Sequence, residues 1–103
     1  MAYNLVVTEH AEELLDQLVY YLIYQLKNEQ AAKHLLDSID SIYDRLEVNP
    51  RQFPISHDAY LAQKGYHEAI VSSMNYVVTF AIKSDSVNVI GIFHQSESYP
   101  KKI

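Results

Sequence analysis

Residues 65–94 contain three apolar segments separated by two short polar turns, and this pattern limits the fold more than any other feature. Each segment is rich in β-branched or aromatic residues, as strands are. Strands joined by connections this short must pair antiparallel. The C-terminal half is therefore predicted to form an antiparallel sheet from segments 65–71, 75–80 and 87–94.

Alternation along the second and third segments predicts which side chains share a face. Tyr76, Val78, Phe80 and Ile82 fall on one face of the second strand. The third strand alternates imperfectly, because Ile90 and Ile92 add apolar side chains to its second face. Such a strand is expected to be central in the sheet and covered on both faces.

The N-terminal half predicts a short strand followed by two helices. Residues 2–7 are apolar, and Thr8 is a suitable helix cap before acidic residues that favour a helix N-terminus. Apolar residues then recur every three or four positions up to Leu26, which is typical of a helix that packs on one side. Asn28 is predicted to end this helix and cap a second one, and Asn49-Pro50 stops the second helix.

Residues 48–64 carry two prolines and no clear periodicity, so an irregular connection is expected there. The two helices are joined by only a few residues and must form an antiparallel hairpin. The predicted fold class is α+β, with the order β-α-α-β-β-β and a helical hairpin packed on a small antiparallel sheet. A chain of 103 residues is expected to be a single domain, 1–103.

Charge and composition exclude several classes of protein. Residues 1–50 hold nine acidic and three basic residues, and residues 51–103 hold four acidic and five basic ones. No concentrated basic patch of the kind that nucleic-acid binders carry is evident. The chain has no cysteine, no metal-ligand spacing, no signal-peptide pattern and no apolar run of membrane-spanning length. We expect a cytoplasmic protein with no metal, no cofactor and no membrane association.

The order and spacing of several short segments resemble the RelE/ParE superfamily of toxins from bacterial type II toxin–antitoxin systems. The resemblance covers essentially the whole chain. The segments that carry it are Val7 to Leu15, Asn28 to Ala32, Leu46 to Pro50, Gly65-Tyr66, Asn75 to Phe80 and Ile90 to His94.

The resemblance implies a toxin that arrests growth until a cognate antitoxin blocks it. ParE-like members bind DNA gyrase, whereas RelE-like members cleave mRNA on the ribosome. RNA cleavage needs a general base, a general acid and cations on the phosphate. An antitoxin is expected to lay a helix or strand into an apolar groove of its toxin.

This chain departs from the nuclease pattern at several positions. Where nuclease members often carry arginine, it has His67 after Gly65-Tyr66 and Val77 after Asn75-Tyr76. Gln95 and Ser96 replace the basic residues usual after the last strand. Without these cations, few basic side chains remain to bind the phosphate, and RNA cleavage is disfavoured.

The residues that remain for such chemistry are few. If the chain is a nuclease, the resemblance assigns His67, His94 and Tyr99 as catalytic and Lys64, Lys101 and Lys102 as substrate-binding. Histidines can exchange protons near neutral pH, although a histidine at a strand end more often has a structural role. Three hypotheses follow: a ParE-like toxin that binds gyrase, which we favour, a ribosome-dependent endoribonuclease that uses histidines, or a decayed non-toxic member.

Overall fold

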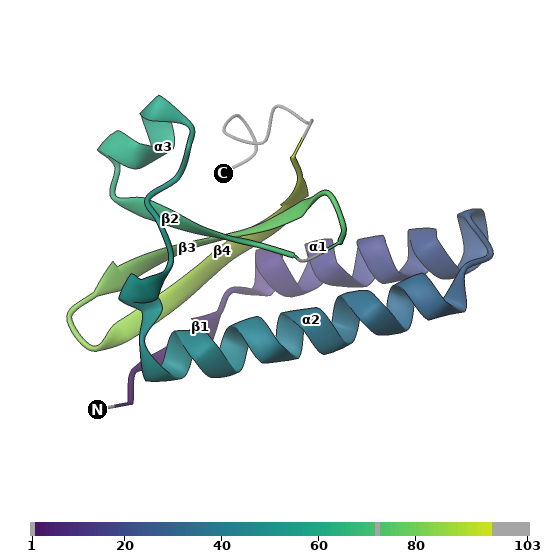
Figure 1. Cartoon of the computed structure of the whole chain (residues 1–103), viewed down its shortest axis with the longest axis horizontal. Helices are drawn as coiled ribbons and strands as arrows, with labels where there is room; N and C mark the ends of the chain where they lie inside the picture. Colours follow the sequence, from purple (N-terminus) through teal and green to yellow (C-terminus); the bar gives the residue numbers. More distant parts are fainter. Residues whose placement is uncertain (1, 72, 96–103) are drawn as a thin grey trace.

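The computed structural model describes residues 2–71 and 73–95 and confirms the predicted α+β class (Figure 1). Two long helices form a hairpin on one side of a four-stranded sheet, and a short third helix lies on the other side. The elements are β1 (Asn4–Val7), α1 (Glu9–Tyr20), the π-helical turn η1 (Tyr21–Gln25), α2 (Glu29–Val48), the 3-10 turn η2 (Pro50–Gln52), α3 (Ala59–Gln63), β2 (Tyr66–Ile70), β3 (Tyr76–Lys83) and β4 (Ser86–His94).

The sheet has the order β1-β4-β3-β2, and it is mixed. β3 pairs antiparallel with both β2 and β4, as the short turns require. β1 instead runs parallel to β4, with Leu5 opposite Val87 and Val7 opposite Val89. The expectation of a wholly antiparallel sheet is therefore wrong for β1. The whole helical hairpin separates β1 from β2–β4, so its pairing direction is not restricted by a short turn.

Side-chain caps fix the ends of the helices where the sequence predicts them. The Thr8 hydroxyl accepts a hydrogen bond from the Ala11 amide at 3.1 Å, and the Asn28 side chain accepts one from the Ala31 amide at 3.0 Å. Each cap satisfies an amide that has no partner within its own helix. α2 ends at Val48, directly before Asn49-Pro50.

The main hydrophobic core lies between the hairpin and the sheet. α2 contributes a buried stripe that includes Leu35, Ile39 and Leu46, spaced for one face of a helix. The predicted shared face of β3 is confirmed, because its members all belong to or pack against this core: Tyr76, Val78, Phe80 and Ile82.

A β-bulge changes the faces of β4. Thr79 pairs with Gly91, but the next residue, Phe80, pairs with Val89, so β4 has one extra residue at Ile90. The extra residue moves Ile92 to the face of Val89, in the main core. The expectation that Ile92 lies on the second face is therefore wrong, whereas the central position of β4 is confirmed.

The segment 48–64 is more regular than expected. It contains η2 and the five-residue helix α3, which Asp58 caps by accepting a hydrogen bond from the Leu61 amide at 3.0 Å. Leu61 packs with Val77 and Phe93 in a second, small cluster on the other face of the sheet, and Leu14 of α1 reaches this cluster as well. Within the described residues no helix is long and apolar enough to cross a membrane.

Candidate functional site

His67 lies on β2 in an aromatic cluster that it helps to order. Its ring stacks on Phe80, with 5.5 Å between ring centroids and 21° between planes. Its Nδ1 lies 3.2 Å from the backbone oxygen of Phe53, so Nδ1 donates a hydrogen bond to that carbonyl. The structure thus gives His67 a packing and anchoring role, and a catalytic role for it remains a prediction.

His94 ends β4 and packs edge-on against Tyr76, with 5.5 Å between ring centroids. Across the sheet, His67 pairs with Phe80, whereas His94 pairs with Tyr76, four residues earlier on β3. Strand rise and strand spacing place the two histidine backbones roughly 16 Å apart. A general acid and a general base must both reach one phosphodiester. The sheet does not bring the two histidines together in this way.

Lys64 follows α3 and is fully exposed, with its ammonium nitrogen 4.8 Å from the centroid of the Tyr60 ring. A hydrogen bond with the Tyr60 side chain raises the pKa of Lys64, which keeps it charged. The other predicted site residues, Tyr99, Lys101 and Lys102, lie outside the described residues.

Val77 occupies the β3 position where nuclease members often carry arginine. Only 1% of its surface is exposed, and it packs against Leu61 and Phe93. An arginine here would need space and solvent for its charge, which this cluster does not provide. The position is therefore part of the packing, not of a phosphate site.

A contact that the sequence analysis missed joins His57 to Glu68. The Glu68 carboxylate is buried on β2, and its Oε1 accepts hydrogen bonds from the His57 backbone amide at 3.0 Å and from Nδ1 at 2.7 Å. The pair holds the loop before α3 against β2. The signal in the sequence was a carboxylate within an apolar strand, since a buried charge needs a partner.

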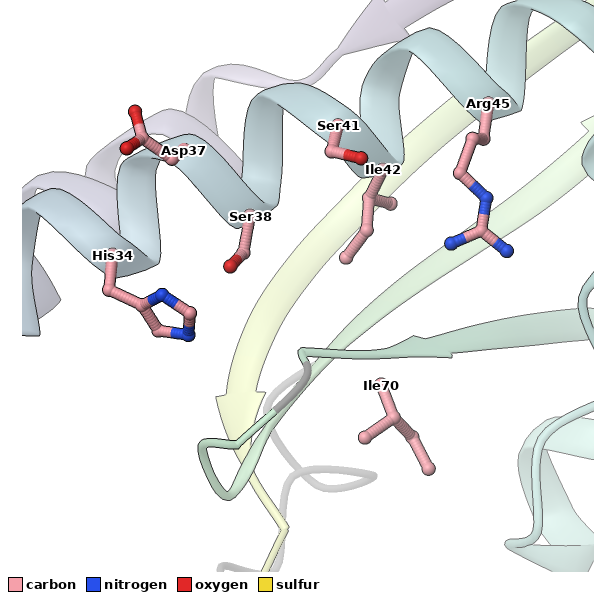
Figure 2. A pocket seen from close by; sticks show the side chains of 7 residues that line it. All are labelled: His34, Asp37, Ser38, Ser41, Ile42, Arg45 and Ile70. Atoms are coloured by element: carbon pink, nitrogen blue, oxygen red, sulfur yellow. The ribbon is translucent and has the colours of Figure 1, made fainter.

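A groove of about 280 Å³ lies between α2 and the end of β2 (Figure 2). Ser38, Ile42 and Arg45 point from α2 into it, and Ile70 lies across from them on β2 with its side chain pointing away from α2. The groove thus combines apolar side chains with polar and charged ones. Its lining is His34, Asp37, Ser38, Ser41, Ile42, Arg45 and Ile70.

The wall at Ile70 is also the open end of a sheet edge. β2 is an edge strand, and residues 54–56 cover its outer side through hydrogen bonds with Tyr66 and Glu68. Outward-facing backbone groups alternate along a strand, so the amide and carbonyl of Ile70 point to the same edge, beyond this cover. Ile70 is 57% exposed. An extended peptide could pair with the strand here.

Among the described residues, no group of three or more histidine and carboxylate side chains is placed to hold a metal ion. The described surface offers a groove of mixed polar and apolar lining, an open strand edge and exposed aromatic side chains.

Comparison with known proteins identifies the family. The model of the family described as "ParE toxin of type II toxin-antitoxin system, parDE" matches residues 5–99, and the chain belongs to this family. A solved structure titled "Chromosomal ParDE TA system from P. aeruginosa" has the same fold, with a TM-score of 0.72 and 16% sequence identity. The match covers 90% of this chain and 96% of that one. No curated protein matches the sequence. The chain is the toxin of a type II toxin–antitoxin pair, within the RelE/ParE superfamily, and its partner is an antitoxin.

Proposed function

We propose that this toxin arrests growth by binding DNA gyrase and not by cutting mRNA. The observation that carries the proposal is the burial of Val77 in an apolar cluster, at the position where nuclease members often carry arginine. A side chain in that place cannot stabilise charge on a phosphate. Binding a protein target needs no such cation.

The chemistry of RNA cleavage explains why the absence of a cation at Val77 supports this proposal. Charge develops on the phosphate as the 2′-oxygen attacks, and cations placed beforehand around it supply much of the rate enhancement. His67 uses its Nδ1 to bond Phe53, and its sheet position is roughly 16 Å from that of His94. These facts speak against one catalytic centre that contains both histidines.

The groove between α2 and β2 is the surface that we assign to the antitoxin. An extended segment could pair with the edge at Ile70 and place an apolar side chain over Ile42. Asp37 and Arg45 on the rim could then form ion pairs with oppositely charged residues beside that side chain. This mode agrees with the expectation of a strand or helix laid into an apolar groove.

Induced expression without the antitoxin tests the mechanism. We expect growth arrest with DNA breaks that depend on gyrase, while primer extension finds intact transcripts. Specific mRNA cuts that disappear with His94→Ala would overturn the proposal in favour of the endoribonuclease. Normal growth with folded protein present would favour the decayed member.

Ile70→Asp tests the antitoxin groove in the same cells. A charge on the exposed wall should weaken antitoxin binding about tenfold or more and leave growth arrest unchanged. The exposed Val48, which does not line the groove, provides the matched control Val48→Asp. Equal antitoxin affinity for wild type and Ile70→Asp would contradict the assignment.

A further inference from the structure

The outer side of α1 ends in exposed aromatic side chains at the tip of the helical hairpin. Tyr20 and Tyr24 are 60% and 58% exposed, and their ring centroids lie 4.6 Å apart. Tyr21 and Leu26 beside them are also exposed. We call these four residues the tyrosine tip. Large apolar side chains that gather in solvent commonly mark an interaction site.

The backbone at the tip departs from an ordinary helix. α1 continues as the π-helical turn η1, and the Leu26 amide donates a hydrogen bond to the Tyr21 carbonyl at 3.0 Å. Lys27 then adopts a left-handed conformation with φ of 54°, which costs free energy in a residue other than glycine. π-turns and strained residues concentrate at functional sites. The tyrosines next to this backbone remain exposed.

The stretch of α1 that leads to the tip carries only acidic charges, and Lys27 in the hairpin loop is the first cation that follows it. From Glu9 to Leu26 the chain has four carboxylates and no lysine or arginine. Helical spacing puts Glu13 and Asp16 on the same exposed stripe as Tyr20. In the described part of the chain none of these carboxylates forms an ion pair. Such a stripe attracts cationic side chains and repels nucleic-acid phosphates. The four are Glu9, Glu12, Glu13 and Asp16.

The tyrosine tip is separate from the groove assigned to the antitoxin. None of the seven residues that line the groove belongs to the tip or to α1. A toxin that acts by binding must contact two proteins, its antitoxin and its target. The tip is therefore available to a second protein when the groove is occupied.

We propose that the tyrosine tip, with Glu13 and Asp16, is the surface with which this toxin binds its target, and that the target presents arginine or lysine side chains there. An arginine can stack on the Tyr20 and Tyr24 rings while it pairs with Asp16. Tyrosine and arginine are the residues that most often carry interface energy. This inference rests on the proposed mechanism of target binding.

Purified DNA gyrase is the probe for the test, with binding measured at low and at physiological salt. Tyr20→Ala/Tyr24→Ala removes the aromatic surface, and Glu13→Lys/Asp16→Lys reverses the charge. Tyr60→Ala is the matched control, because Tyr60 is an equally exposed tyrosine on α3, far from the hairpin tip (Figure 1). Thermal unfolding verifies that each variant is folded.

We expect each double variant to bind gyrase at least about tenfold more weakly and to lose growth arrest, while Tyr60→Ala matches wild type. Wild-type affinity should fall as salt rises, whereas the affinity of the charge-reversed variant should rise, because salt screens the new repulsion. If wild type binds gyrase and both double variants bind equally well, the tip is not the target surface, although the proposed mechanism stands. If wild type itself does not bind gyrase, the mechanism fails, and this inference fails with it.

Discussion

The two faces of the sheet differ in size and in content. The face under the hairpin carries one large apolar core in which Leu35, Ile39 and Phe80 are fully buried. The opposite face has a small cluster built around Val77 and Phe93, next to buried polar groups. The large core holds the fold, whereas the small face is where nuclease relatives often carry cations.

This difference supports the proposal that the toxin does not cut mRNA. Glu68 and Thr79 are cross-strand partners on the small face, and both are buried. Glu68 binds His57, while the Thr79 hydroxyl has no hydrogen-bond partner among the described residues. Here a carboxylate, a hydroxyl and apolar side chains take the space that a cationic phosphate site would need. The small face therefore contributes to the packing of the fold.

Truncation of Phe80 should cause the largest loss of stability. Phe80 packs against Phe53 and His67 in the large core, so Phe80→Ala should lower the free energy of unfolding by about 3–5 kcal/mol. Leu61→Ala, on the small face, should cost less, about 2–3 kcal/mol. Urea unfolding measures both, and an equal or reversed order would contradict the described difference between the faces.

A charge at Val77 should have the next largest effect. Val77→Arg restores the residue type of the nucleases but inserts a cation into an apolar cluster, at a cost of about 3 kcal/mol or more. We expect a lower thermal midpoint and no gain of mRNA cleavage. Val77→Leu should be tolerated far better. Wild-type stability in Val77→Arg would show that the position is open to solvent and available for catalysis.

Neutralising Glu68 should have a moderate effect. Glu68→Gln weakens the hydrogen bonds from His57, and the free energy of unfolding should fall by about 1–2 kcal/mol. Limited proteolysis should then cut the loop before α3 sooner than in wild type. Unchanged stability and unchanged cleavage would mean that this pair does not hold the loop.

The smallest loss of stability should come from ionisation of Tyr43 at high pH. Burial, together with the nearby Glu12 and Asp40, raises the pKa of Tyr43 to about 12. The unfolded chain releases this proton near pH 10, so the stabilisation is complete below pH 10 and is lost as the pH rises toward 12. Because the side chain is only partly buried, we expect a loss of about 1–2 kcal/mol. Tyr43→Phe should lack this part of the pH dependence. If the stability of wild type and of Tyr43→Phe changed equally from pH 9 to 12, this prediction would be contradicted.

Local features of the fold could be predicted from the sequence because their causes lie within a few residues. The caps at Thr8 and Asn28 and the stop at Asn49-Pro50 follow from side-chain and proline geometry. Parallel pairing of β1 with β4 could not be predicted in this way, since it depends on where the entire hairpin returns the chain.

The candidate site was harder to predict than the fold. The bulge at Ile90 reassigns the face of Ile92, and single-strand alternation carries no sign of it. The contact of His57 with Glu68 joins a loop to a strand, and a five-residue helix lies between them. Val77, in contrast, could be recognised in the sequence as an apolar residue where nuclease members often carry arginine, because the change in chemistry is visible in the residue itself.

The most direct test of the central claim is DNA supercoiling by purified gyrase in the presence of this toxin. We predict that the toxin inhibits supercoiling in proportion to its concentration and that the cognate antitoxin restores it. Supercoiling at the full rate, at toxin concentrations that cut ribosome-bound mRNA, would contradict the account.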